Sequence, residues 1–178
     1  MKNTRTFFLL MLLAATAFVG FRTIMVSEWT VVVDDVSINI TGKSLKATVT
    51  GLEAEISFSP ADLANSSFKA SIDARTLETS NKTQTKHANS EKWMDTEKYP
   101  TISFTSKEIK SEGEAYAVVG DLEMHGVTKE VTMPFTFTET KEGGTFEGSM
   151  HIIRSDFNIG KGGFVKEVDV TISVPVTQ

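Results

Sequence analysis

The stretch TKHANSEKWMDTEKYPTISF, at residues 85–104, gathers side chains that often perform chemistry in proteins. It holds His87, Trp93 and several carboxylates within a few residues of one another. A general acid–base site or a metal site would use residues of these types. The alternative is a structural segment whose carboxylates face water while Trp93 packs beneath the fold. The elements that the rest of the chain places around this stretch decide between these readings.

Metal binding and nucleophilic catalysis find little support in the residue spacings. A metal site would draw on His87, His125 and His151, but they lie in different segments, and the chain has no Cys. This pattern predicts three exposed histidines rather than a metal centre. No G-x-S-x-G sequence occurs, and the Gly-rich run at 160–163 lacks the spacing of a phosphate-binding loop. The sequence therefore predicts no catalytic residue and no cofactor, and an enzyme acting on a lipid stays a remote alternative.

From Trp29 onward, apolar and polar residues alternate with a period of two. This alternation predicts antiparallel strands with one buried face and one face in water. The apolar positions of successive segments are Trp29/Val31/Val33, Leu52/Ala54/Ile56/Phe58, Phe68/Ala70/Ile72, Ile102/Phe104, Tyr116/Val118, Met133/Phe135/Phe137, Phe146/Met150/Ile152 and Val168/Val170/Ile172/Val174. About eight such segments separated by turn residues favour an all-β fold, either a closed barrel or a sandwich.

One turn has a recognisable signature. His125-Gly126 fits a two-residue hairpin loop, because both residue types tolerate positive φ better than most. That register places Lys129 on the same face as Met133, which is acceptable only at the rim of a barrel. A longer turn through Thr128 avoids this placement, and both registers remain open from the sequence.

The N-terminus resembles an export signal. Lys2 and Arg5 precede an uncharged apolar run at 7–21, and Ala15-Thr16-Ala17 offers the small residues that signal peptidases accept. We expect residues 1–20 to be a signal peptide cleaved near Ala17, with an uncleaved anchor as the alternative. The run is shorter than the roughly 20 apolar residues that a spanning helix needs.

The charge of the chain limits its partners. The 178 residues carry a net charge of −5, and cleavage after Ala17 would make it −7, because the removed segment contains two cations and no acid. An acidic protein is a poor candidate for binding nucleic acid or anionic lipid surfaces. Without Cys, an exported domain must be stable through its core alone.

Two features of the apolar face point beyond simple packing. The face is rich in Phe and Met, which in a barrel of about eight strands would either fill a solid core or line a pocket for a long apolar guest. Arg154 follows Met150 and Ile152 with the same parity, so its side chain should point inward. A buried cation is unfavourable without a partner. We expect a salt bridge at the rim with an acid such as Asp156, and contact with the polar end of a ligand is the alternative.

Several segments together resemble the YceI-like family of lipid- and polyisoprenoid-binding proteins. They are IDARTLET at 72–79, KHANSEKWMDTEKYPTISFTS at 86–106, GDLEMHGVTKEVTMPF at 120–135, IIRSDFNIG at 152–160 and VKEVDVTISV at 165–174. The resemblance implies an extended, eight-stranded, antiparallel, lipocalin-like β-barrel with a short helical crossover, spanning 27–178. It implies an exported protein, periplasmic or secreted, without catalysis.

The resemblance also implies the function: binding, transport or sequestration of an amphiphilic polyisoprenoid or fatty-acyl lipid inside the barrel. The alternative is a ligand-free structural or interaction module with a solidly packed barrel. Membrane contact is expected only for ligand exchange or through an uncleaved N-terminal segment, and a homodimer is compatible with the sequence. The candidate ligand contacts are Phe58, Phe68, Ile72, Trp93, Ile102, Phe104, Val118, Leu122, Met133, Phe135, Phe137, Met150 and Ile152, with His87 and Arg154 at a polar end.

The first stretch is interpreted in the same way. It resembles the crossover that closes one end of the barrel, with Trp93 and Met94 as a buried wedge and Tyr99-Pro100 as the corner before the next strand. Family members often carry a continuous R-D-x-H-L-R-S motif here, whereas this chain has QTKHANS at 84–90. Only His87 and Ser90 match that motif, so the ligand contact or helix docking contributed by this segment is altered.

We predict that the mature protein begins between about residues 18 and 28 and is found outside the cytoplasm, because of the signal-like N-terminus. N-terminal sequencing of protein from the exported fraction tests this. Recovery of the intact Met1 terminus from soluble cytosol would contradict it.

Overall fold

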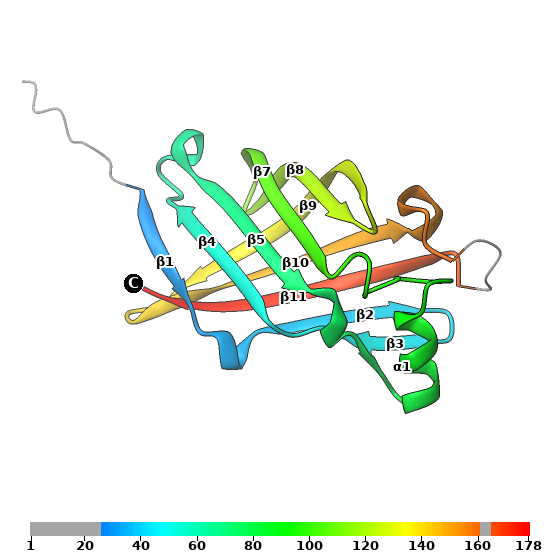
Figure 1. The fold of residues 1–178 in the computed structure, drawn as a ribbon. Helices are drawn as coiled ribbons and strands as arrows, with labels where there is room; N and C mark the ends of the chain where they lie inside the picture. Colours follow the sequence, from blue (N-terminus) through cyan, green and yellow to red (C-terminus); the bar gives the residue numbers. More distant parts are fainter. Residues whose placement is uncertain (1–25, 161–164) are drawn as a thin grey trace, which may run out of the picture.

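The computed structural model describes residues 26–160 and 165–178. Eleven strands, one α-helix and four 3₁₀ turns make up these residues (Figure 1). In chain order they are β1 (Ser27–Val31), η1 (Val33–Asp35), β2 (Ser37–Gly42), β3 (Leu45–Thr48), β4 (Leu52–Phe58), η2 (Leu63–Asn65), β5 (Ser67–Asp73), η3 (Ala74–Thr76), β6 (Glu78–Thr79), α1 (Lys82–Asn89), β7 (Thr101–Glu112), β8 (Ala115–Met124), β9 (Val127–Glu139), β10 (Gly143–Ile153), η4 (Arg154–Phe157) and β11 (Glu167–Thr177).

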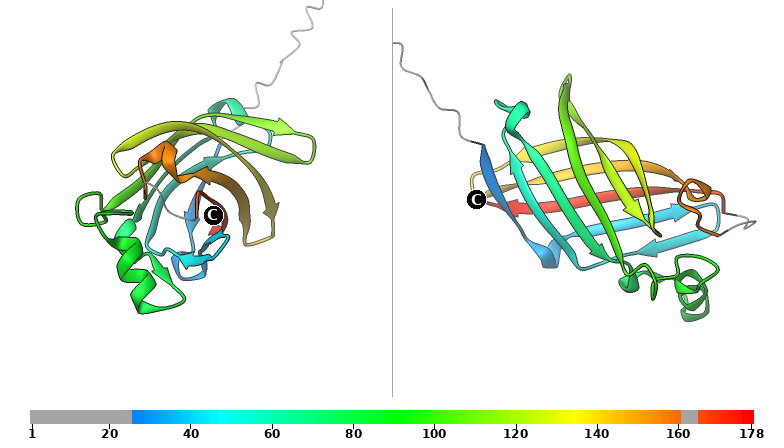
Figure 2. Two further views of the ribbon diagram at one scale, coloured as in Figure 1. Left: turned by 90° about the vertical axis from the view of Figure 1, so that its right-hand side faces the viewer. Right: turned by 45° about the horizontal axis from the view of Figure 1, so that its top comes forward.

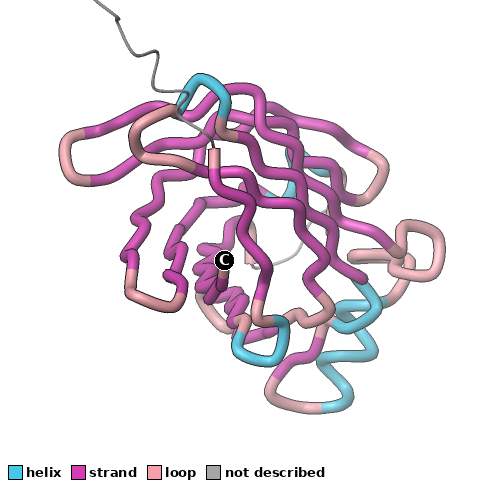
Figure 3. Tube along the Cα trace, turned by 90° about the vertical axis from the view of Figure 1, so that its left-hand side faces the viewer, coloured by secondary structure: helices cyan, strands magenta, loops and turns pink. Residues whose placement is uncertain are grey.

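Eight of the strands close an antiparallel barrel in the order β1-β4-β5-β7-β8-β9-β10-β11, with β1 returning to β11. The strands encircle a common interior when the molecule is viewed along its long axis (Figures 2 and 3). The closing contact is short: Thr30 pairs with Thr177, and Val31 pairs with Val176. The predicted eight-stranded antiparallel barrel is confirmed.

Three further strands extend the sheet beside the barrel in the order β11-β2-β3-β6. β1 pairs with β11 at Val176 and Thr177, and β2 pairs with the same strand at residues 169–173. β1 and β2 therefore act as one strand that η1 interrupts. The interruption corrects one detail of the sequence analysis. Val33 was expected on the inward face, but it lies in η1 and is 54% exposed.

The β8–β9 hairpin has the two-residue loop. Met124 pairs with Val127, and His125 and Gly126 both have positive φ, at 52° and 72°. Lys129 therefore has inward parity, opposite Leu122, and yet it is exposed. It can be exposed because this part of β9 pairs with β8 and not with β10.

The barrel wall has an incomplete seam between β9 and β10. Of these two strands, only residues 135–139 of β9 and residues 144–148 of β10 pair with each other. In the described ladder, the first half of β9 pairs only with β8, and residues 149–153 of β10 pair only with β11. The seam follows from the register, and it leaves Lys129 at an open edge of the wall.

The end of the barrel that β1 closes is filled by aromatic rings. Phe58 is fully buried, and its ring lies 5.2–5.9 Å from the rings of five other aromatic residues: Phe68, Tyr116, Phe135, Phe137 and Phe146. Trp29 packs on Phe137 and donates a hydrogen bond from Nε1 to the carbonyl oxygen of Phe58 at 2.9 Å. Edge-to-face contacts dominate this cluster, as the quadrupoles of aromatic rings favour.

We predict that Phe58→Ala lowers the free energy of unfolding by about 3–5 kcal/mol, because a fully buried ring leaves a void among rigid neighbours. Urea unfolding of the ligand-free protein measures the loss. Phe104→Ala is the matched control, since Phe104 is half-buried and lines a cavity, and it should lose less. Equal losses in the two variants would contradict the distinction between a packed cluster around Phe58 and a cavity beside Phe104.

Candidate functional site: an apolar cavity in the barrel

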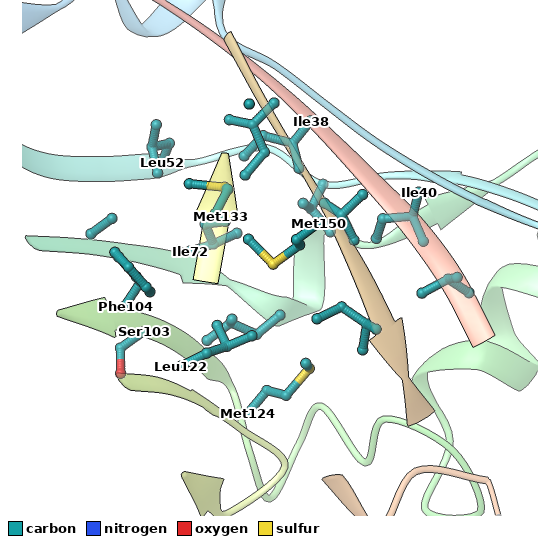
Figure 4. Close-up of a pocket in the computed structure, with 18 of the residues that line it drawn as sticks. Ile38, Ile40, Leu52, Ile72, Ser103, Phe104, Leu122, Met124, Met133 and Met150 are labelled. Atoms are coloured by element: carbon teal, nitrogen blue, oxygen red, sulfur yellow. The ribbon is translucent and has the colours of Figure 1, made fainter. Parts of the chain in front are cut away.

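A cavity of about 250 Å³ occupies the barrel interior beside the aromatic cluster. Its wall is almost entirely apolar, and the labelled side chains in Figure 4 converge on it from strands on all sides. The apolar side chains that line it are Ile38, Ile40, Leu45, Ala47, Val49, Leu52, Ala54, Ile56, Phe68, Ala70, Ile72, Leu77, Ala88, Trp93, Met94, Ile102, Phe104, Leu122, Met124, Met133, Phe135, Phe146, Met150, Ile152, Ile159, Val168, Val170, Ile172 and Val174.

The pleat of the strands explains this wall. Successive side chains of a strand point to opposite faces, so the alternating residues of each barrel strand enter one interior. Met150 and Ile152 of β10 point inward, whereas Ser149 and His151, which alternate with them along the strand, are exposed. Polar groups on the wall are few: Lys69, Ser103, Glu147 and Arg154.

Eleven of the residues proposed from the sequence lie on the cavity wall. They are Phe68, Ile72, Trp93, Ile102, Phe104, Leu122, Met133, Phe135, Met150, Ile152 and Arg154. Four lie elsewhere. Phe58 and Val118 are fully buried in the packed core, and Phe137 stacks on Phe146 at 4.4 Å in the aromatic cluster. His87 lies on α1 outside the wall, with its ring 5.8 Å from that of Trp93.

Sequence reasoning overlooked the side chains that β2 and β3 contribute. Ile38 and Ile40 of β2 and Leu45 and Ala47 of β3 line the cavity, although none of them was among the candidate ligand contacts. The signal was present as a period-two alternation of apolar residues among Ser, Asn, Thr and Lys. Leu77, Ala88 and Met124 were likewise missed, and Met94 was expected to be buried in the crossover but was not proposed as a ligand contact.

The end of the cavity farthest from the aromatic cluster is formed by the crossover and by η4, which lie at the same end of the barrel (Figure 1). The Arg154 guanidinium carbon lies 4.3 Å from the centroid of the Trp93 ring. Arg154 is only 6% exposed, and burial lowers the pKa of its guanidinium. Trp93 is half-buried, so the expected buried wedge covers the guanidinium but stays partly in water.

The salt bridge expected between Arg154 and Asp156 is wrong. Asp156 is exposed, and no carboxylate of the described residues pairs with Arg154. Within the described structure, Nε and Nη1 of Arg154 have no hydrogen-bond partner. The parity argument placed this side chain inward, but the chain turns into η4 at Arg154 and carries Asp156 away to solvent.

The YceI-like domain matches residues 19–177. A UPF0312 protein of Photorhabdus laumondii is 36% identical over 138 residues, which are 73% of this chain and 72% of the relative. Protein YceI of Escherichia coli O157:H7 is 31% identical over 142 residues, which are 75% and 74% of the two chains.

The chain belongs to the YceI-like family. Two solved structures share its fold. Burkholderia cenocepacia BcnA superposes with a TM-score of 0.79 at 26% identity, covering 84% of this chain and all of BcnA. A polyisoprenoid-binding domain from Saccharophagus degradans superposes with a TM-score of 0.64 at 13% identity, covering 85% of this chain and 98% of that domain.

This YceI-like protein builds residues 84–89 of the altered segment into α1, with Ser90 as the C-cap residue. The Asn81 side chain accepts a hydrogen bond from the Gln84 backbone N–H at 2.8 Å and so caps the helix. The Asn89 side chain donates to the Leu77 carbonyl oxygen at 3.1 Å, which attaches the last turn to the chain before β6. The helix is short, and no helix among the described residues is both long and apolar enough to cross a membrane.

The three histidines of this YceI-like protein lie apart. His125 stacks on Tyr99 at 4.6 Å, and its Nδ1 lies 3.1 Å from the Phe157 carbonyl oxygen. His151 is on the outer face of β10, where a hydrogen bond with Asp169 and a weaker one with Glu167 raise its pKa. His87, on α1, is exposed. Among the described residues, no three His or carboxylate groups gather as metal ligands would.

We predict that Gly160→Ala destabilises the protein more than Gly113→Ala does. Both glycines have positive φ, at 60° and 69°, so each alanine loses about 1–2 kcal/mol through backbone conformation alone. A methyl group at Gly160 would also lie 2.5 Å from Nη1 of Arg154 and 2.8 Å from Cε3 of Trp93, whereas Gly113 has open space. Urea unfolding of both variants should show about 1 kcal/mol or more of additional loss at Gly160. Equal losses would mean that Trp93 and Arg154 do not hold the positions described.

Proposed function

We propose that this YceI-like protein binds an amphiphilic lipid-like molecule whose long apolar chain lies in the barrel, and that it carries, buffers or sequesters this ligand without catalysis. The observation that carries the proposal is the apolar cavity, which adjoins the packed aromatic cluster and shares Phe68, Phe135 and Phe146 with it. A wall of flexible Met and branched aliphatic side chains can adapt to a chain of variable length. A related fold in a polyisoprenoid-binding domain adds support.

The composition of the wall favours binding over catalysis. Ser103 is the hydroxyl-bearing residue on the described wall, and none of the three histidines lies on it, so no Ser–His pair faces the cavity. Lys69 and Glu147 lie on strand positions whose side chains reach solvent. A lipid-modifying reaction would need an activated nucleophile or a general base next to the guest.

The rival function is a structural or interaction module that holds no ligand. The packing around Phe58 agrees with this rival at one end of the barrel, whereas the hollow at the other end favours a ligand. The exported location belongs to the same proposal and depends on the signal-like residues 1–20, which lie outside the described residues. A carrier outside the cytoplasm would protect an apolar chain from water between membranes.

Met150→Glu is expected to weaken binding of a fluorescent long-chain fatty acid or prenol by about tenfold or more, because a carboxylate in an apolar cavity is unfavourable. Met150 is half-buried on the wall, so the ligand-free barrel should tolerate the change. Fluorescence titration of delipidated protein measures the affinity, and a thermal melt confirms folding. Ser149→Glu is the matched control, because Ser149 is the exposed neighbour on the opposite face of the same strand, and it should bind like the wild type. Absence of saturable binding to the wild type would overturn the proposal.

A further inference from the structure

Arg154 is the one charged side chain of the described cavity wall that is removed from water. Lys69 also touches the wall, but its side chain is 69% exposed and lies 3.8 Å from the Glu55 carboxylate. Arg154 is 6% exposed and lies at the end of an otherwise apolar space. Burial of a cation is strongly unfavourable unless a counter-charge or hydrogen-bond acceptors compensate it.

The protein supplies little of that compensation. Nε and Nη1 of Arg154 are buried and have no acceptor within the described structure. Burial alone accounts for the lowered pKa of the guanidinium, with no opposing contribution from a nearby carboxylate. The residues that the structure does not describe, 1–25 and 161–164, contain no Asp or Glu in their sequence, so they offer no carboxylate side chain.

Trp93 compensates the cation without occupying its donors. The indole ring lies over the guanidinium at 4.3 Å and attracts it through the negative face of the ring. An indole ring has no lone-pair acceptor, so its contact with the guanidinium does not supply the hydrogen-bond acceptors that the N–H groups of Arg154 lack. Gly160 packs close to both side chains, because a Cβ there would lie 2.5 Å from Nη1 of Arg154 and 2.8 Å from Cε3 of Trp93.

We propose that Arg154 binds the anionic head group, a carboxylate or a phosphate, of the amphiphile whose chain fills the cavity. The planar fork of N–H donors matches the paired oxygens of either anion, and the low-polarity surroundings strengthen such a pair. The inference rests on the proposed function and adds the orientation of the guest. The head group lies between the crossover and η4, and the chain runs from there toward the aromatic cluster around Phe58.

The test compares two pairs of probes that share a chain and differ in the head group. Hexadecanoate is paired with hexadecanol, and geranylgeranyl monophosphate with geranylgeraniol, each titrated below its aggregation limit into delipidated full-length mature protein. A charge-assisted hydrogen bond inside a protein typically favours its partner by about tenfold or more, so the wild type should prefer at least one anion over its matched alcohol by that factor. Comparison of the two pairs distinguishes a carboxylate ligand from a phosphate ligand.

Arg154→Gln should bring the anion-to-alcohol ratio to within about threefold of unity, because a neutral amide keeps hydrogen bonds but not the charge. The alcohol should bind both proteins alike. Arg154→Lys should retain part of the preference, since the charge remains while the planar fork is lost. Lys69→Gln is the control, and it should leave the ratio unchanged, because that cation is exposed and paired with Glu55. Both members of a pair are titrated against the same variant, so a change in stability does not alter the ratio.

Other outcomes are decisive as well. If the wild type binds acid and alcohol equally, or if Arg154→Gln keeps the wild-type ratio, Arg154 is a packing residue and the inference is overturned while lipid binding stands. If Arg154→Gln does not fold, the ratio for Arg154→Lys decides, and an unchanged ratio overturns the inference. If the wild type binds neither member of either pair, the proposed function fails and the inference fails with it.

Discussion

Closure of the sheet is the constraint on which the rest of the structure depends. β1 joins β11 through only two residue pairs, yet these complete the ring of eight strands. In a closed antiparallel barrel every second side chain must point inward, so closure converts an alternating sequence into one enclosed apolar space. The 3₁₀ turn η1 makes closure possible, because it lets one chain segment pair with β4 and β11 and then continue along β11 as β2.

Side-chain size then decides which part of that space is filled. Phe58, Phe135, Phe137 and Phe146 meet ring against ring at the end closed by β1, and large rings at short separations leave little room. Toward the crossover the inward positions hold mostly aliphatic and Met side chains, which surround the cavity in place of stacked rings. One strand pattern therefore produces a packed cluster and a cavity without any change of fold.

The fold could be predicted from the sequence because strand parity is a local property. Alternation identified the inward faces of all eight barrel strands, and the signature at His125-Gly126 was compatible with the hairpin that the structure contains. Parity failed where the chain leaves a strand at Val33 in η1, because a 3₁₀ turn resets the direction of the side chains. Arg154 points inward as parity predicts, but η4 begins there, and the partner expected at Asp156 lies in solvent. The division between packed core and cavity could not be read locally either. Phe58 and Phe68 have the same parity and residue type, yet Phe58 is fully buried in the cluster and Phe68 also lines the cavity. This difference depends on distances across the barrel, which the local sequence does not contain.

The two ends of the barrel are stabilised by different interactions. The wall and the end closed by β1 depend on backbone pairing and ring packing. The other end brings together Trp93 of the crossover, Arg154 of η4 and Gly160, which meet through side-chain and van der Waals contacts rather than a strand ladder. Proteins open locally where such backbone pairing is sparse, with free energies below that of global unfolding. The incomplete β9–β10 seam begins on the same side, since residues 149–153 of β10 lead directly into η4. The end that holds the buried cation is therefore expected to open at a lower free-energy cost than the end where β1 pairs with β11.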